Sequence, residues 1–315
     1  MLLTEVLMVV GFCLAAYAVV SNDSIQTLGT FIAANSQRTW WQLWLFASSI
    51  MVVVLLYGFI TDGNPSYGRL DRIPEPSAGV SWIHVSAPLA LLILTRFGVP
   101  VSTTFLVLSV FAPREIDAMA IKSLTGYLVA FVTAVVLYTA IRGVMQRLME
   151  SDSEAVSPRW YIFQWASTAF LWSQWLIQDL ANIFVFLPRE LDWGWILFGT
   201  TVLVVMQGVI FYQQGGAIQQ IVTTKTHTSD VRSATLIDLV LGTILLIFKE
   251  ASNLPMSTTW VFLGLLAGRE LAIAWQFEDK SVSLAAKLVG KDALKAFAGL
   301  VISVIIALTG VWIGT

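Results

Sequence analysis

Charged side chains are scarce in this chain: Asp, Glu, Lys and Arg together make up 12% of its 315 residues. Soluble domains carry about a quarter charged residues, so the composition excludes a soluble globular domain and a disordered tail. The 18 basic and 20 acidic residues nearly cancel, leaving a formal net charge of -2. A chain without an excess of basic residues lacks the surface that attracts a polyanion, which excludes a nucleic-acid partner.

Residues that form disulfides or bind soft metals are also few. The single cysteine, Cys13, excludes a disulfide framework and a cysteine-based zinc site. The two histidines, His84 and His227, are too few for a multi-histidine metal centre, and we expect no bound cofactor. Hydrophobic residues, by contrast, reach 57%, and the mean hydropathy is +0.77. The composition therefore predicts a polytopic protein of the lipid bilayer.

Six segments are long and apolar enough to cross a membrane, which takes about 20 residues in a helix. They lie near 4–35, 40–60, 118–143, 160–187, 194–213 and 294–313, and the first is broken by the polar sequence Ser21-Asn22-Asp23-Ser24. Polar linkers are predicted at 61–80, 146–159, 214–233 and 276–292.

Two further apolar regions, 83–112 and 235–275, are interrupted at their centres. In each, Gly or Asn is followed by Pro and then by Ser-Thr-Thr. A continuous crossing should not contain this interruption, whereas two half-helices that meet at a re-entrant tip require it. We therefore predict helical hairpins with tips near 98–104 and 253–259.

The interrupted regions belong to an internal repeat. The tip VPVSTTF at 99–105 recurs as LPMSTTW at 254–260. Asp23 lies 77 residues before the first tip proline and Asp179 lies 76 before the second, and a carboxamide, Gln26 or Asn182, follows each aspartate by three residues. An Arg-Glu pair also follows each tip serine by twelve residues. Features that recur in register indicate a duplication.

The duplication predicts an all-α fold of inverted repeats, with six crossing helices (some broken) and two re-entrant hairpins. Residues 1–145 form the first repeat, 146–159 a linker and 160–315 the second repeat. Because each half crosses the membrane three times, the second half enters from the opposite side. Eleven Lys and Arg residues fall on the side of the linker and five on the other, which places the linker in the cytoplasm and both termini outside. We expect a multi-pass protein of a bacterial or archaeal inner membrane.

Several motifs carry a resemblance to the inorganic phosphate transporter (PiT) family. SNDSIQTLGTF at 21–31 resembles that family's Asn-Asp-x-x-Asn-x-x-Gly-Thr motif, and QDLANIFVFLP at 178–188 resembles its second copy. The tips are similar to the family's Pro-x-Ser-Thr-Thr-His motif. The resemblance implies a homodimeric secondary transporter that moves an oxyanion with sodium or protons. The chain departs from the pattern at Gln26, Phe105, Gln178, Phe186 and Trp260, and these changes bear on the substrate and the coupling ion more than on the fold.

The residues around the two aspartates predict the site. A carboxylate at bilayer depth is costly without a partner, and the nearby ligand atoms are all oxygens, which hard cations such as Na⁺ prefer. The candidate cation ligands are Asn22, Asp23, Gln26, Gln178, Asp179 and Asn182. The candidate substrate ligands are the tip hydroxyls of Ser102, Thr103, Thr104, Ser257, Thr258 and Thr259. Ser102 and Ser257 are predicted to cap the returning helices, whose free N–H groups would bind an oxyanion.

The favoured interpretation is a symporter of phosphate and Na⁺, with sulfate or another oxyanion and proton coupling as alternatives. An intramembrane lipid-modifying enzyme and a channel-like or non-transporting relative are the other classes. The tips could instead be structural kinks, and Asp23 and Asp179 could be buried pairs that hold the bundle together. Several roles stay open: Arg96 as an anion ligand, Asp238 as a third ion ligand or a partner of Lys249, and the pairs Arg114-Glu115 and Arg269-Glu270, for which interfacial anchoring or salt bridging is favoured.

Overall fold

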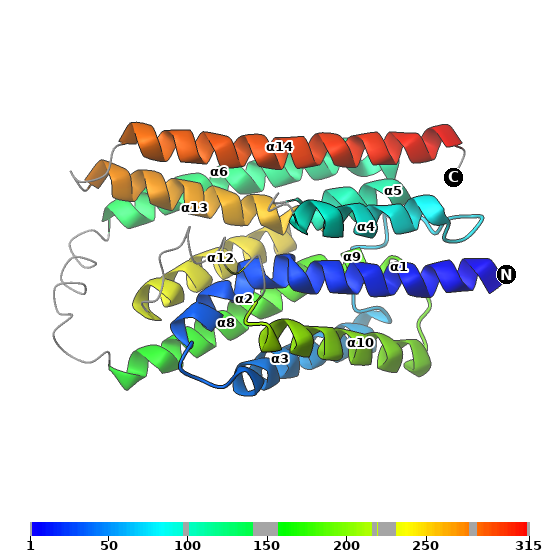
Figure 1. Ribbon diagram of the computed structural model, residues 1–315, viewed down its shortest axis with the longest axis horizontal. Helices are drawn as coiled ribbons and strands as arrows, with labels where there is room; N and C mark the ends of the chain where they lie inside the picture. Colours follow the sequence, from blue (N-terminus) through cyan, green and yellow to red (C-terminus); the bar gives the residue numbers. More distant parts are fainter. Residues whose placement is uncertain are drawn as a thin grey trace.

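A computed structural model of the protein describes residues 2–96, 101–140, 157–215, 219, 231–276 and 282–313. Within these residues the chain is helical and contains no β-strand. The helices lie along one common direction and form an elongated bundle with both termini at the same end (Figure 1). This confirms the predicted all-α fold.

The first half of the chain contains a broken crossing, a returning helix, a hairpin and a final long helix. The elements are α1 (Leu2–Ser21), α2 (Asp23–Ala34), α3 (Trp40–Asp62), α4 (Trp82–Arg96), the π-helix η1 (Thr104–Leu108), α5 (Ser109–Phe111), the 3₁₀ turn η2 (Pro113–Glu115) and α6 (Ile116–Ala140). The break between α1 and α2 falls at Asn22, inside the polar sequence that interrupts the first predicted crossing.

The second half contains the corresponding elements in the same order. They are α8 (Pro158–Asp179), α9 (Ala181–Phe184), α10 (Trp193–Tyr212), α12 (Val231–Ala251), α13 (Thr258–Gln276) and α14 (Val282–Ile313). The linker prediction for 276–292 is wrong from residue 282 onward, because α14 begins there. Ala, Leu and Lys dominate this stretch and are strong helix formers, so polarity alone does not break the helix. Residues 141–156 lie outside the described residues, and they include most of the linker predicted at 146–159.

Six of the described helical stretches are long and apolar enough to cross a membrane, as a multi-pass membrane protein requires. They are Leu2–Ala34, Trp40–Asp62, Pro113–Ala140, Trp193–Tyr212, Val231–Ala251 and Val282–Thr309. Val231–Ala251 belongs to the second predicted hairpin and not to a predicted crossing, although its length alone would allow it to cross. The predicted crossing at 160–187 is absent from this set because α8 contains many polar residues. Gln164, Thr168 and Gln178 on α8 are fully buried, so its polar face points into the bundle.

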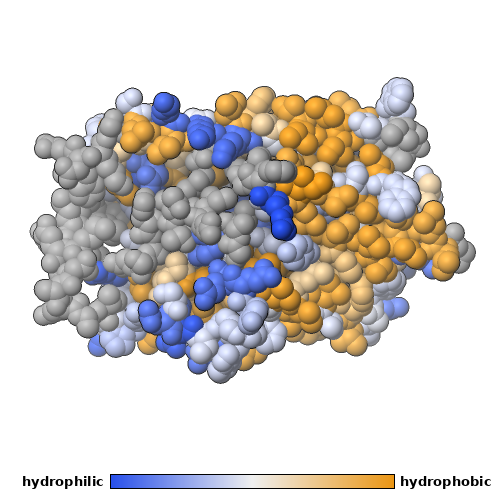
Figure 2. Space-filling view, viewed as in Figure 1, coloured by the Kyte–Doolittle hydropathy of each residue, from blue (hydrophilic) through white to orange (hydrophobic). Residues whose placement is uncertain are grey.

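The surface of the bundle is apolar where lipid would cover it. Large hydrophobic side chains such as Val53, Val136 and Leu294 are exposed on α3, α6 and α14. Figure 2 shows a broad hydrophobic area over the part of the bundle that contains the chain termini. Monomeric soluble proteins rarely expose apolar patches of this extent, so this surface agrees with a bilayer environment.

Both interrupted regions form hairpins. We call α4 with η1 and α5 hairpin 1, and α12 with α13 hairpin 2. Residues 252–257 are not helical and separate the two arms of hairpin 2. In hairpin 1 the first arm ends at Arg96 and the helix resumes near Thr104, with residues 97–100, including the tip proline, outside the described residues. The hairpins enter from opposite ends of the bundle and converge near its middle (Figure 1).

Two glycines let hairpin 2 approach α6 very closely. A Cβ atom added to Gly264 would lie 2.3 Å from the backbone oxygen of Tyr127, and one added to Gly268 would lie 2.2 Å from that of Phe131. Both distances are far inside van der Waals contact with main-chain atoms, so only glycine fits. Gly264 and Gly268 are four residues apart and face one side of α13, the small-residue spacing that brings membrane helices together. This packing sets the position of the second tip.

Candidate functional site

The two carboxylates of the repeat, Asp23 and Asp179, both lie at helix breaks. Asp23 begins α2 directly after the break at Asn22, and Asp179 ends α8 directly before α9. Each is 1% exposed. The backbone stays hydrogen-bonded at both breaks, since the N–H of Asn22 donates to the oxygen of Ala18 at 3.0 Å and that of Leu180 donates to the oxygen of Leu176 at 2.9 Å. These two positions therefore place a buried carboxylate at a local irregularity of a helix.

The tip of hairpin 1 docks onto the first break. The Thr103 hydroxyl donates a hydrogen bond to Oδ2 of Asp23. The Asn22 side-chain amide donates to Oδ1 of Asp23 at 2.8 Å and to the backbone oxygen of Val101 at 3.3 Å. The first carboxylate is therefore held by its own helix and by the tip.

The second half repeats this arrangement at Asp179. Thr258 donates to Oδ2 of Asp179 at 2.6 Å, and Asn182 donates to Oδ1 at 2.7 Å. Thr103 and Thr258 occupy matching places in the two tips, as the sequence repeat indicates. The carboxamides do not match: Gln26 donates to Oδ1 of Asn22 at 3.3 Å, so in the first half Asn22 contacts the aspartate directly.

The two tips also contact each other across the pseudo-repeat. Thr259 of the second tip donates to Asp23 at 3.3 Å, and Asn182 donates to the Thr104 hydroxyl at 3.2 Å. Thr104 in turn donates to the backbone oxygen of Met256 at 3.1 Å. These contacts join the candidate residues in one buried group. We call it the tip cluster: Asn22, Asp23, Gln26, Thr103, Thr104, Asp179, Asn182, Thr258 and Thr259.

The tip serines cap the returning arms, as the sequence predicts. Ser102 Oγ accepts a hydrogen bond from the Phe105 backbone N–H at 3.3 Å, and Ser257 Oγ accepts from that of Trp260 at 3.2 Å. The first turns of both returning arms thus begin beside the tip cluster. Their remaining N–H groups are aligned with the positive end of the helix dipole, which favours an anion. The rings of Phe105 and Trp260 lie 5.8 Å apart just beyond the tips.

The candidate cation ligand Gln178 forms hydrogen bonds with residues outside the tip cluster. Gln178 donates to the backbone oxygen of Leu245 at 3.1 Å. Its side-chain oxygen accepts from Nε of Arg69 at 3.0 Å. Gln178 therefore positions the second break rather than presenting a free oxygen to the tip cluster.

Sequence reasoning missed two cationic residues near the site. Arg69 belongs to the loop between α3 and α4 yet is 1% exposed, and Lys122 on α6 donates to the backbone oxygens of Ser252 and Leu254 at 2.9 and 2.6 Å. The loop contains Pro, Gly and charges, which is typical of a solvated linker. No periodicity in the sequence signals that Arg69 turns inward, whereas a lone lysine within an apolar crossing was a usable signal for Lys122.

Most of the residues left open by the sequence lie outside the tip cluster. Asp238 is fully buried and accepts hydrogen bonds from Thr30 at 2.7 Å and Thr168 at 2.5 Å, while Lys249 pairs with Glu250 at 3.2 Å. Asp238 is therefore not the partner of Lys249.

The remaining charged residues have structural or peripheral places. Arg269 forms an ion pair with Glu270 at 3.2 Å and lies over the Tyr138 ring, which agrees with the salt-bridge interpretation. Arg96 and Arg114 are exposed, so Arg96 does not reach the buried site. His84 accepts from the Ser81 backbone N–H at 3.1 Å, in a structural role.

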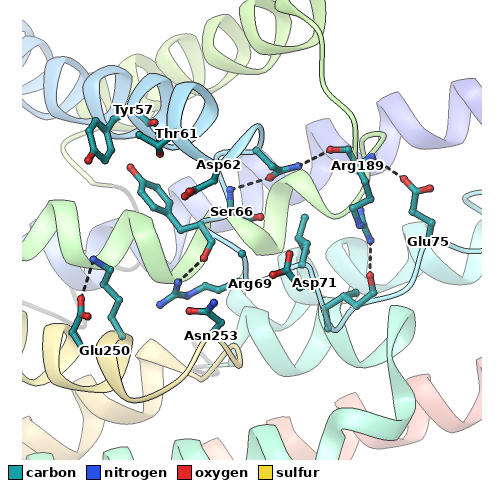
Figure 3. Close-up of a pocket in the computed structure, with 16 residues that line it drawn as sticks. Tyr57, Thr61, Asp62, Ser66, Arg69, Asp71, Glu75, Arg189, Glu250 and Asn253 are labelled. Atoms are coloured by element: carbon teal, nitrogen blue, oxygen red, sulfur yellow. Dashed lines mark hydrogen bonds and ion pairs between the residues drawn. The ribbon is translucent and has the colours of Figure 1, made fainter.

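A polar cavity of about 910 Å³ lies beside the second break. We call it the vestibule; its 16 lining residues come from the end of α3, the loop that follows, Arg189, the end of α12 and Asn253 (Figure 3). Arg69 lies on its wall and, through Gln178, connects it to the residue next to Asp179. No residue of the tip cluster lines the vestibule, so the contact between Arg69 and Gln178 is the link between the vestibule and the second break.

Comparison with known proteins identifies a solved structure with a similar fold. No protein-family model matches the chain, and no curated protein sequence matches it. Among solved structures, the chain is similar to one described as the sodium-dependent phosphate transporter, with a TM-score of 0.68 and 15% sequence identity over 99% of both chains. The likeness extends over the whole length of the chain and shows a shared fold.

Proposed function

We propose that this protein, which folds like a sodium-dependent phosphate transporter along its whole length, is a symporter that moves inorganic phosphate across a membrane with Na⁺. The observation that carries the proposal is the tip cluster. Two carboxylates at helix breaks and the hydroxyls of two facing tips are joined there by hydrogen bonds at the centre of the bundle. Transporters of inverted repeats bind their substrates at such discontinuous helices near the membrane midplane.

The cation sites are assigned to the two breaks. Asp23 with Asn22 and Gln26, and Asp179 with Asn182, supply carboxylate and carboxamide oxygens, to which Thr103 and Thr258 add hydroxyl oxygens. Such a set of oxygens suits a hard cation such as Na⁺. Gln178 contributes by holding the helix break, because both ends of its amide have protein partners.

The oxyanion is assigned to the capped N-terminal turns of the two tips, which contact each other through Thr104 and the backbone oxygen of Met256. The N–H groups at the start of each returning arm favour a negative charge, whereas two unneutralised carboxylates nearby would repel it. Bound cations would remove that repulsion, so binding of cation and anion should be coupled. Sulfate has the same shape and is the second candidate substrate.

The assembly and orientation follow from the same proposal. The two halves, 1–145 and 160–315, are assigned as inverted repeats, since the hairpins enter from opposite ends of the bundle (Figure 1). The excess of Lys and Arg on the side of the 146–159 linker assigns that side to the cytoplasm and both termini to the outside of an inner membrane. A homodimer is the expected oligomer.

Uptake by proteoliposomes tests the function. We expect the purified protein to accumulate labelled phosphate when an inward Na⁺ gradient is imposed, and not when K⁺ replaces Na⁺. Competition with unlabelled sulfate then measures the choice of oxyanion. Phosphate entry independent of any cation gradient would indicate a channel-like protein, and no entry of either oxyanion under sodium or proton gradients would contradict transport.

The double variant Ser102→Ala with Ser257→Ala tests the tips. Each lost cap costs about 1 kcal/mol of stability, so the protein should still fold, while the released N–H groups orient less well toward an oxyanion. We expect the dissociation constant for phosphate, measured in Na⁺ buffer, to rise about tenfold. Ser86→Ala, which removes a hydroxyl bonded to the Ile83 backbone in the arm of hairpin 1, is the matched control. Unchanged affinity in the double variant would mean that the tips are only structural kinks.

A further inference from the structure

Arg69 is buried and forms no ion pair with a carboxylate of the described residues, although Asp179 and Glu250 both favour its charge electrostatically. Its Nε donates to Gln178 at 3.0 Å and its Nη1 to the backbone oxygen of Tyr67 at 3.5 Å, whereas its Nη2 has no hydrogen-bond partner in the described part of the chain. The ion pairs among the described residues, Lys249–Glu250 and Arg269–Glu270, do not involve it. A guanidinium has five N–H donors, and a buried charge without a counterion is costly. The Nη2 edge of Arg69 therefore lacks a hydrogen-bonded anion among the described residues.

The vestibule offers room for that partner. Its volume of about 910 Å³ is ample for a small oxyanion with its water, and Arg69 forms part of its wall near Asn253 (Figure 3). Two of its acids are already engaged: Glu250 pairs with Lys249, and Glu75 accepts from the Arg189 backbone N–H at 2.7 Å.

Arg69 is the most deeply buried of the three basic residues that line the vestibule, the others being Arg189 and Lys249. Asp62 and Asp71 are exposed. The Arg189 guanidinium donates to the backbone oxygens of Val185 and Ile73, each at 3.1 Å. The vestibule thus has acids at its exposed parts and the Arg69 guanidinium at its buried wall, so an anion that enters is attracted inward.

The Arg69 charge persists at neutral pH. Burial lowers the pKa of Arg69 to about 10, against the opposing influence of Asp179 and Glu250. A guanidinium with that pKa stays protonated at pH 7, so the positive wall of the vestibule is permanent.

We propose that Arg69 forms a second oxyanion site in the vestibule, where a tetrahedral inorganic oxyanion binds before it reaches the tip cluster. The guanidinium fork matches two oxygens of such an anion. Its bond to Gln178, the neighbour of Asp179, joins this outer site to the second helix break. The identity of the anion as phosphate rests on the proposed function. The geometry of the guanidinium indicates only the class of ligand, a tetrahedral inorganic oxyanion.

Arg69→Gln tests the outer site, with Arg72→Gln as its control. Arg72 lies three residues along the same loop, is exposed and does not line the vestibule. In sodium-driven uptake by proteoliposomes, we expect Arg69→Gln to raise the KM for phosphate about tenfold or more, Arg69→Lys to raise it less, and Arg72→Gln to leave it unchanged. Increasing ionic strength should raise the KM of the wild type more than that of Arg69→Gln. Salt screens the attraction between the Arg69 charge and the anion, and the variant lacks that charge. An unchanged KM, or a loss of Vmax alone, would overturn the proposal.

Asp71→Asn decides the question if Arg69→Gln does not fold. Asp71 is exposed and lines the vestibule, so its substitution should not disturb the core. Removing this negative charge should lower the KM for phosphate two- to threefold at low salt, whereas Glu5→Gln, an exposed acid outside the vestibule, should not. Equal KM values for both variants would refute the outer site. Absence of phosphate uptake by the wild type would instead refute the proposed function, so the two failures are distinguishable.

Discussion

Asp23→Asn and Asp179→Asn are each expected to abolish sodium-driven phosphate uptake, or to raise the sodium concentration for half-maximal uptake at least tenfold. Each substitution replaces an ionisable carboxyl group of an oxygen-only shell with a neutral carboxamide, which keeps the side-chain size and one acceptor oxygen. A neutral carboxamide holds Na⁺ much less strongly than a carboxylate does. The coupled anion site then loses its neutralising cation.

The same variants should lose the sodium-induced gain in phosphate affinity, because coupling between two ligands is reciprocal. Phosphate binding to the purified protein, measured with and without Na⁺, checks this directly. Asp117→Asn, an exposed aspartate at the start of α6, should behave as wild type. If Na⁺ has no effect on wild-type phosphate affinity, the two aspartates would be better assigned as proton carriers.

Gly264→Ala and Gly268→Ala should both destabilise the protein and impair transport. The added Cβ would lie 2.3 or 2.2 Å from a backbone oxygen of α6, and a backbone atom cannot move aside as a side chain can. α13 must therefore shift away from α6, and it carries Thr258 and Thr259 with it. Overpacking of this kind costs about 1–3 kcal/mol, occasionally more, and we expect the upper part of that range.

Thermal unfolding followed by tryptophan fluorescence, together with uptake, measures both effects. Gly290→Ala is the matched control: a Cβ there meets nothing within 4 Å, and alanine is favoured over glycine inside a helix by up to about 1 kcal/mol. Its Tm should equal or exceed that of the wild type. Equal Tm values for Gly264→Ala and wild type would show that α6 and α13 do not pack as closely as described.

The chain also illustrates how a repeat reveals a site. Asp23 and Thr103 are 80 residues apart, and Asp179 and Thr258 are 79 apart, yet both pairs form hydrogen bonds. The sequence predicted that the aspartates and the tip hydroxyls belong to one site, because the duplication aligns the two halves, but it did not predict which threonine bonds to which aspartate. The Pro-x-Ser-Thr-Thr interruptions predicted the hairpins for a local reason, since proline and a polar run cannot continue an apolar crossing.

What the sequence by itself determined was therefore the membrane class, the hairpins, the serine caps and the paired carboxylates, each of which follows from composition, local backbone chemistry or internal repetition. The tertiary structure alone decided the inward position of Arg69, the choice of Asn22 over Gln26 beside Asp23, and the separation of Asp238 from Lys249. These depend on the direction in which a loop turns and on the rotation of a helix across a break. Neither the loop nor the break has a periodic pattern, so their geometry is set by distant packing partners rather than by neighbouring residues.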